Sequence, residues 1–295
     1  MSRAQANGIE IEYETFGDPA APALLLVMGF GTQLTAWDEG FCTALADRGR
    51  FVIRYDNRDV GLSTHLDGQL VDVGAVIGSL MGGVAPDVPY LLSDMAADGI
   101  GLLDALGIEK AHVLGASMGG MIAQAMAIEH PERVLTLTSV MSTTGEQEYG
   151  QSSPEAMAAL LSPPPAERED YVHQAIATWK VWASPRYWNE DYIRARAGAG
   201  YDRCFYPEGA TRQLAAIYAS GDRSDGLSAL DVPMLVIHGR DDTLITPEGG
   251  ERTAELVPGS RYLLLSDMGH DHPAPLWPVL AEAIGGHVRA TMITD

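Results

Sequence analysis

Short, solid apolar runs recur along the chain, and helix-like stretches separate them. The runs are ALLLVM, RFVIRY, HVLG, VLTLTSV, MLVIHG and RYLLLS. Segments that are apolar at nearly every position are typical of parallel strands buried on both faces of a sheet. The opening segment IEIEYET alternates apolar and polar residues instead, so we expect an edge or half-buried strand there.

Between these strands the sequence predicts helices over five ranges: 35–48, 91–106, 118–130, 248–257 and 275–290. The second is the weakest, because Gly99 and Gly101 each cost about 1 kcal/mol relative to alanine in a helix. Strands that alternate with helices indicate an α/β fold, in which a mostly parallel, twisted sheet is covered by helices.

The alternation fails in two places. Residues 65–90 are rich in glycine and proline and predict a long mobile loop. Residues 145–225 contain no solid strand, include the proline run SPPPAER and concentrate aromatic residues, and the strand pattern resumes after them at VPMLVIHG. We therefore expect a mainly helical cap or lid at 145–225, inserted into a core domain of residues 1–144 and 226–295.

The aromatic residues of this cap have two interpretations. Each one taken singly is most simply explained by packing inside a small helical lobe. As a group they also favour an apolar pocket, because such pockets are lined mainly by hydrophobic and aromatic side chains. The candidates for substrate contact are Trp179, Trp182 and Trp188.

Composition narrows the classes of partner. The chain has 295 residues, of which 46% are hydrophobic, and a formal net charge of −21, which disfavours nucleic acid and anionic membranes as partners. No apolar stretch approaches the roughly 18 to 20 residues of a membrane helix, and the first residues lack the apolar segment of a secretory signal. We therefore expect a cytoplasmic protein, with Cys42 and Cys204 as reduced thiols because neither stands in a metal or disulfide spacing.

One serine stands where a strand gives way to a helix. Gly115-Ala116-Ser117-Met118-Gly119 matches the pattern G-x-S-x-G between strand 111–115 and helix 118–130. The turn is so sharp that side chains two positions from the serine would collide, which explains the glycines. Such a turn exposes the Ser117 hydroxyl at the carboxyl edge of the sheet. It also aims the backbone N–H of Met118 at an oxygen that becomes negative during attack.

The rival interpretations of these glycines predict a nucleotide site and fail on detail. GASMGGM has the glycine spacing of a phosphate loop, but Met121 stands where that loop needs lysine. GFGTQL lacks the third glycine of a dinucleotide fingerprint. The sequence therefore predicts no cofactor.

A serine at its ordinary pKa is a poor nucleophile. The hypothesis that Ser117 is a catalytic nucleophile therefore requires a histidine and a carboxylate, in the chain order serine, acid, histidine. Both occur just past strand ends, in VPMLVIHGRDDTLITP and in RYLLLSDMGHDHP. Parallel strands would open these loops on the same face as Ser117. The first loop leaves Asp241 and Asp242 as alternatives for the acid, and His238 at the strand end is a candidate to buttress it.

For the base, His270 is favoured over His272. Gly269 lets the loop turn close to the serine, whereas His272 stands against Pro273 at a helix start. A metal site on His270-Asp271-His272 is disfavoured, because no third ligand has a suitable local spacing.

An oxyanion needs a second donor, and the first sharp loop after a central strand is the usual source. Here that loop is VMGFG, residues 27–31. We expect the donor to be the backbone N–H of Phe30, with Gly29 allowing close approach to substrate, and a plain glycine turn is the alternative.

With these residues assembled, the chain resembles the α/β-hydrolase fold superfamily from about residue 8 to residue 290. The segments that carry the resemblance are FGDPAAPALLLVMG, VIRYDNRDVGLST, AHVLGASMGG and HPERV. Within the superfamily they are most similar to the aclacinomycin methylesterase group of serine esterases, which remove a methyl ester from an aromatic polyketide. That group shares the FGDP opening and the methionine-glycine loop.

The resemblance implies an α/β-hydrolase fold whose nucleophile, acid and base are Ser117, Asp242 and His270. Related sequences place the acid just ahead of a proline-terminated apolar stretch, here residues 243–247, which favours Asp242 over Asp241. An aspartate stands in place of the serine in the haloalkane dehalogenases and epoxide hydrolases of this fold, so those activities are disfavoured.

We therefore expect a serine carboxylesterase that works through an acyl-serine intermediate, in particular a methylesterase of a hydrophobic or aromatic natural product. The expected partner is a small hydrophobic ester, with the protein a monomer or a homodimer. Lactone or C–C bond hydrolysis and perhydrolysis on the same scaffold remain open, as does a small-molecule binder without turnover.

Overall fold

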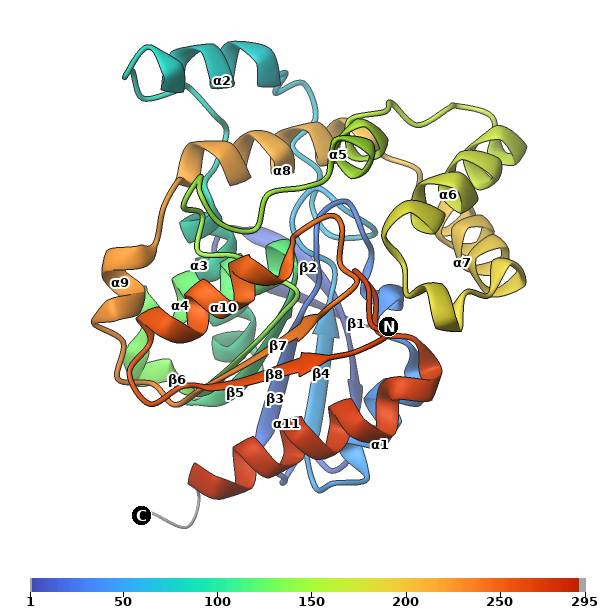
Figure 1. Ribbon diagram of the computed structural model, residues 1–295. Helices are drawn as coiled ribbons and strands as arrows, with labels where there is room; N and C mark the ends of the chain where they lie inside the picture. Colours follow the sequence, from blue (N-terminus) through green and yellow to red (C-terminus); the bar gives the residue numbers. More distant parts are fainter. Residues whose placement is uncertain (1, 292–295) are drawn as a thin grey trace.

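An eight-stranded sheet forms the centre of the molecule (Figure 1). The computed structural model describes residues 2–291, and the strand order is β1-β2-β4-β3-β5-β6-β7-β8. The strands are β1 (Ser2–Ala6), β2 (Ile9–Phe16), β3 (Ala23–Val27), β4 (Phe51–Tyr55), β5 (Ala111–Ala116), β6 (Val134–Val140), β7 (Met234–Gly239) and β8 (Arg261–Leu265). β3 to β8 run parallel to one another, and β2 pairs antiparallel with both β1 and β4. The predicted mostly parallel sheet is confirmed.

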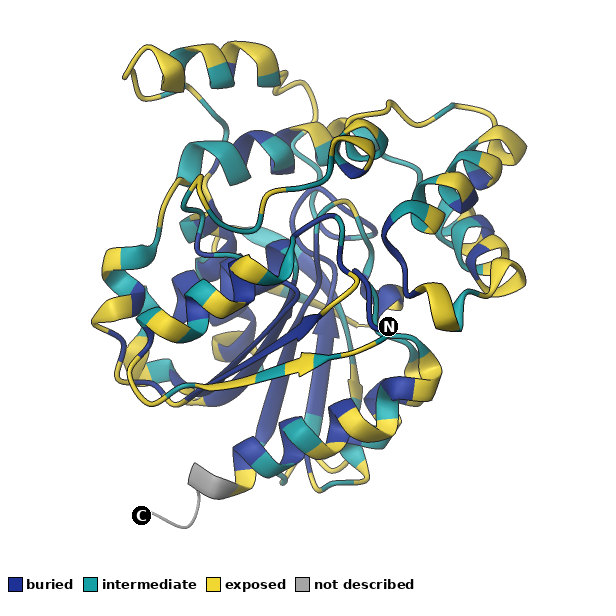
Figure 2. Cartoon of the chain, viewed as in Figure 1, coloured by how far each residue is buried: buried dark blue, intermediate teal, exposed yellow. Residues whose placement is uncertain are grey.

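Helices cover both faces of this sheet because successive strand residues point to opposite sides. In β3, Leu25 and Val27 join one core cluster with α3 (Leu92–Ala105) and α4 (Met118–Glu129), and α10 (Pro247–Leu256) packs against it. Leu24 and Leu26 join the opposite cluster with α1 (Glu39–Ala46) and α11 (Trp277–Thr291). Figure 2 shows the central strands buried between the two helix layers and β8 exposed at the edge, which leaves the ends of the central strands as the place for a site.

Four helices follow β6 and lie over the carboxyl ends of the strands (Figure 1). They are α5 (Pro154–Leu160), α6 (Arg168–Trp182), α7 (Glu190–Arg203) and α8 (Pro207–Ser220). A short helix, α9 (Ser224–Ser228), then leads the chain back to β7. We call α5 to α8 the cap. Within residues 2–291, no helix is both long and apolar enough to cross a bilayer.

Three elements differ from the sequence expectation. The run RYLLLS contains β8 at the edge of the sheet, where its residues are exposed or only partly buried, so the expectation of burial on both faces is wrong for this strand. The N-terminal segment SRAQA forms β1, which pairs with β2 along the outer edge of the sheet and is too polar to give a strand signal. Residues 65–90 contain α2 (Val73–Met81), so the expectation of an uninterrupted loop is wrong there. The helix forms because Asp72 caps the N–H groups of Gly74 and Ala75 and because α2 packs on α8, with Val76 buried.

Candidate active site

Ser117 occupies the sharp turn between β5 and α4. Its φ of +56° lies in the left-handed region that residues with a side chain seldom adopt, and its N–H donates to the Val140 carbonyl at 2.9 Å. A Cβ on Gly115 would lie 2.0 Å from the Gly119 carbonyl oxygen, and a Cβ on Gly119 would lie 2.1 Å from that of Val27. Only glycine fits at these two positions, so the turn can bring the serine out at the strand end.

His270 bridges Ser117 and Asp242. Its Nε2 lies 2.9 Å from Ser117 Oγ, and its Nδ1 lies 2.7 Å from Asp242 Oδ2. A carboxylate only accepts hydrogen bonds, so Nδ1 carries a proton, and Nε2 faces the serine hydroxyl. The three residues come from the loops that follow β5, β7 and β8, which meet at one edge of the parallel sheet.

The Asp242 carboxylate is buried and held from several sides. Oδ1 accepts the N–H groups of Leu244 and Ile245, both at 2.9 Å. His238 Nε2 lies 3.5 Å from Oδ2 and 2.8 Å from the Ile245 carbonyl oxygen. Burial acts to raise the pKa of Asp242, but the charges and hydrogen bonds of His270 and His238 outweigh it and hold the pKa below its ordinary value. The group therefore stays ionised beside His270.

The alternative acid and base lie elsewhere. Asp241 is exposed, and its backbone N–H donates to the Met268 carbonyl. The ring of His272 packs on Trp37 at 4.9 Å, and its Nε2 lies 3.2 Å from the Ala36 carbonyl oxygen. Burial lowers the pKa of His272 to about 3, so its ring is neutral. The geometry thus brings Asp242 and His270, and not their neighbours, to Ser117.

The loop of residues 28–31 passes directly over the serine. A Cβ on Gly29 would lie 3.1 Å from Ser117 Cβ and 3.6 Å from Ser117 Oγ. The backbone N–H groups of Phe30 and Met118 donate to no other group among residues 2–291. Both amides are therefore available to an oxygen that develops negative charge near Ser117.

The three cap tryptophans occupy different environments. Trp182 is buried with Leu244, and its carbonyl oxygen accepts the His270 N–H, so it contacts the histidine loop through its backbone. Trp179 packs edge-on against Trp182, with the Arg196 guanidinium over its ring. Trp188 packs in the separate cluster that joins α6 and α7. The substrate contacts expected for these side chains stay a prediction.

Sequence reasoning missed two residues that support the site. Ser142, just after β6, donates from Oγ to the Ser117 carbonyl at 2.9 Å. Asn57, just after β4, donates from Nδ2 to the Met28 carbonyl at 2.8 Å. Ser142 stands in no recognisable motif. Asn57 lies in VIRYDNRDVGLST, one of the segments that carry the family resemblance, but that segment alone assigns it no role. The other available signal was their position just after a buried strand, which many polar residues share.

The chain is similar in sequence to known esterases. The sequence model of a family described as "alpha/beta hydrolase fold" matches residues 22–272. The rhodomycin D methylesterase DauP of Streptomyces sp. (strain C5) is 28% identical, with 95% of this chain and 95% of that protein aligned. The pimeloyl-[acyl-carrier protein] methyl ester esterase of Aeromonas hydrophila is 26% identical over 94% of this chain and 100% of its own length.

Among solved structures, the enol-lactonase from Burkholderia xenovorans LB400 superposes with a TM-score of 0.74 at 25% identity. The match covers 98% of this chain and 100% of that one. The resemblance drawn from the sequence, both to the fold and to methylesterases, is confirmed.

Proposed function

The chain belongs to the α/β hydrolase fold family and is a hydrolase of ester bonds, and we propose that Ser117 is its nucleophile, His270 its general base and Asp242 the acid that orients the base. The observation that carries this assignment is the unbroken line of hydrogen bonds from Ser117 Oγ through the His270 ring to Asp242. A serine without a catalytic role does not need a histidine and a buried carboxylate in line with its hydroxyl group.

The proposed reaction follows from the positions of these atoms. His270 Nε2 takes the proton of Ser117 Oγ as that oxygen attacks the ester carbonyl, and Asp242 stabilises the imidazolium that forms. The N–H groups of Phe30 and Met118 bind the oxyanion of the tetrahedral intermediate, and one such donor typically contributes about 100- to 1000-fold to the rate. His270 then protonates the departing alcohol. Water, deprotonated by the same ring, releases the acid from the acyl-serine.

For the substrate we propose a methyl ester of a hydrophobic or aromatic natural product. Two of the similar proteins are named as methyl ester esterases, and the cap places Trp182 beside the histidine loop. Hydrolysis of a lactone, which is an internal ester, is the second candidate because an enol-lactonase is among the structural relatives. We further propose that the protein works in the cytoplasm as a monomer or homodimer. Nucleic acid and membrane partners are not proposed, because a net charge of −21 disfavours binding to nucleic acid and to anionic membranes.

The test is turnover of p-nitrophenyl acetate, an aromatic methyl ester and a lactone by the whole chain. Ser117→Ala should lower kcat by roughly a million-fold, as removal of such a nucleophile does in a serine hydrolase. It should also abolish labelling by a fluorophosphonate, because the probe needs the activated oxygen. Ser228→Ala, which changes an exposed serine of α9, should keep both properties.

Circular dichroism of both variants checks that they are folded. Full activity in folded Ser117→Ala would exclude the proposed chemistry. A preference for the lactone over the methyl ester in kcat/KM would replace the proposed substrate by the second candidate.

A further inference from the structure

The loop over Ser117 is held by hydrogen bonds to three of its peptide groups. We call residues 28–31 the oxyanion loop. The Met28 carbonyl accepts from Asn57 Nδ2 at 2.8 Å, and the Gly29 carbonyl accepts from Thr32 Oγ1 at 2.9 Å. The Gly31 N–H donates to Gln213 Oε1 at 2.9 Å. The first two partners belong to the core of the molecule, but Gln213 lies on α8 of the cap.

These bonds determine where the Phe30 N–H points. The N–H and C=O of a trans peptide lie in one plane and point in opposite directions. Thr32 holds the Gly29 carbonyl, so the Phe30 N–H of the same peptide is turned to the opposite side. Gln213 fixes the next peptide plane through the Gly31 N–H. Gly31 has a φ of +63°, and glycine leaves such a conformation readily, so this plane depends on its partner.

Gln213 is itself held so that it can act as a rigid support. Its side chain is fully buried, and its Nε2 donates to the Arg58 carbonyl at 2.9 Å. The oxygen must face an N–H and the nitrogen must face a carbonyl, so only one orientation of the amide satisfies both contacts. The preceding residue, Arg212, fixes α8 to the core through two hydrogen bonds of 2.8 Å to the Asp59 carboxylate.

We infer that Gln213 is a positioning residue for the oxyanion loop, and that the cap thereby takes part in forming the catalytic geometry. The inference rests on the proposed function, in which the Phe30 N–H binds the oxyanion. It assigns to the cap a role besides the substrate contacts predicted for it. When α8 is seated, Gly31 is anchored and the Phe30 N–H is aimed. When α8 is displaced, the loop loses its anchor.

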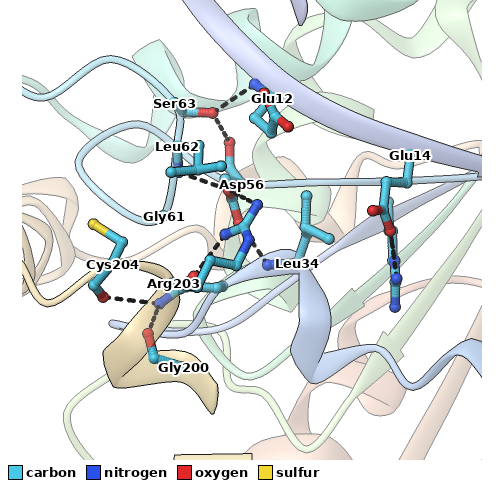
Figure 3. A network of polar contacts seen from close by, with 12 residues as sticks. Glu12, Glu14, Leu34, Asp56, Gly61, Leu62, Ser63, Gly200, Arg203 and Cys204 are labelled. Carbon is cyan, nitrogen blue, oxygen red and sulfur yellow. Dashed lines mark hydrogen bonds and ion pairs between the residues drawn. The ribbon is translucent and has the colours of Figure 1, made fainter. Parts of the chain in front are cut away.

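A second connection between cap and core supplies a matched control. Figure 3 shows Asp56, after β4, where it receives the N–H groups of Leu34 and Leu62 and the guanidinium of Arg203 from α7. Beside it, Gln33 Nε2 donates to the carbonyls of Gly200 and Cys204 at 2.7 and 2.9 Å. Gln33 thus joins core to cap with the same side-chain amide as Gln213, but it makes none of the hydrogen bonds described above for the oxyanion loop.

The experiment compares Gln213→Met with Gln33→Met, since methionine keeps the length of glutamine and removes its hydrogen bonds. For Gln213→Met we expect kcat on p-nitrophenyl acetate to fall roughly 10- to 100-fold with KM little changed, the size of effect that a displaced catalytic group produces. Affinity for a trifluoromethyl ketone, which forms a tetrahedral oxyanion on the serine, should fall by a similar factor. Gln33→Met should retain kcat and this affinity.

Equal losses in both variants, or a loss confined to KM, would overturn the inference, because the cap would then act only by enclosing substrate. So would an unchanged Gln213→Met. Any of these three results together with an inactive Ser117→Ala leaves the proposed function intact, whereas an active Ser117→Ala removes both the inference and the proposed function.

Gln213→Glu is the second variant, in case the methionine disturbs folding. Its carboxyl can still accept from Gly31, but it can donate to the Arg58 carbonyl only when protonated. We expect the ratio of its kcat to that of the wild type to rise as the pH is lowered. A ratio that does not change with pH would contradict a positioning role.

Discussion

Ser117 is held in an unfavourable backbone conformation that serves its proposed role in catalysis. Its left-handed backbone costs on the order of 1–3 kcal/mol, and such strain persists only when the surroundings enforce it. The Val140 carbonyl accepts the Ser117 N–H, and Ser142 donates to the Ser117 carbonyl. Both sides of the residue are therefore held by β6 and the residues after it. The strain brings the hydroxyl to the strand end, within reach of His270.

The close packing of Gly29 against Ser117 can be tested by a single substitution. A Cβ there would lie 3.1 Å from both the Ala116 carbonyl oxygen and Ser117 Cβ, so the loop must move by a few tenths of an ångström to admit it. We expect Gly29→Ala to lower kcat/KM roughly 10-fold or more, because small displacements at a reacting centre are costly. Initial rates on p-nitrophenyl acetate measure the loss of activity, and a thermal melt measures any loss of stability separately.

Gly78→Ala is the control for this substitution. Gly78 lies in α2 with open space around its Cβ position, so alanine should leave activity unchanged and stabilise the helix by up to about 1 kcal/mol. Unchanged kcat/KM in Gly29→Ala would mean that the loop does not lie against the reacting atoms.

How far the site can be predicted from sequence depends on the residue. Ser117, Asp242 and His270 each follow a strand, and parallel strands end at one edge, so their meeting could be expected before any coordinates. Gln213 could not be found in this way. It reaches Gly31 across 182 positions of sequence, from a helix whose direction over the sheet no local pattern specifies.

At the scale of elements, the cap is attached by buried ion pairs as well as by apolar packing. Arg203 on α7 meets Asp56 at 2.8 Å, and Arg212 on α8 meets Asp59 at 2.8 Å. The Asp56 and Asp59 carboxylates are fully buried, and Arg212 is almost so. A buried charge without its partner is costly, so these pairs specify where each cap helix sits more than they add net stability.

Arg212→Met should therefore destabilise the fold strongly. It leaves the Asp59 carboxylate buried and unpaired, and loss of one member of a buried pair typically costs about 3–5 kcal/mol in the free energy of unfolding. Denaturation in urea measures this cost. Adding Asp59→Asn to the same chain removes the orphaned charge and should recover part of the loss.

The exposed pair Arg168–Asp202 provides the comparison, since both side chains are about half exposed. Arg168→Met should cost no more than about 1 kcal/mol. If Arg212→Met were as mild as Arg168→Met, the pair on α8 would not be buried in solution.

The elements themselves could be predicted where their patterns were strong. The six parallel strands were apparent as solid apolar runs, and in β3, β5 and β7 the reason is that both faces of the strand are covered. β8 is an exposed edge strand in spite of its apolar run. β1 was missed because an exposed edge strand needs no apolar residues, only a neighbour that offers its backbone. α2 was missed because Gly74 and Gly78 weaken its helical pattern, and its formation depends on packing against α8.

At the scale of the whole molecule, β5 links the site to global stability. It lies near the centre of the sheet between β3 and β6, with Ser117 directly after its end and His112 near its start. His112 is fully buried, with Nδ1 2.9 Å from Thr136 Oγ1. Within the described residues its Nε2 has no hydrogen-bond partner. Protonation of this ring therefore destabilises the central strand, and with it the entire sheet.

The pH dependence of stability follows from this histidine. Burial, followed by the charges of Arg50 and His287, lowers the pKa of His112 from 6.5 to about 4. In the unfolded chain the ring takes up a proton as the pH falls below about 6.5, whereas in the folded chain it does so only near pH 4. Protonation thus favours the unfolded chain across that window. As the pH falls from about 6.5 to about 4, His112 lowers the free energy of unfolding by up to about 3 kcal/mol.

His112→Gln separates this contribution from that of the many carboxylates, because glutamine can still hydrogen-bond Thr136 but does not titrate. Urea denaturation at pH 7 and at pH 4.5 should show a smaller drop in the free energy of unfolding for His112→Gln than for the wild type. His173→Gln, which changes an exposed histidine of α6, should follow the wild type. Equal drops in all three proteins would mean that the ring at the centre of the sheet is already charged at pH 7 or reaches water in the folded state.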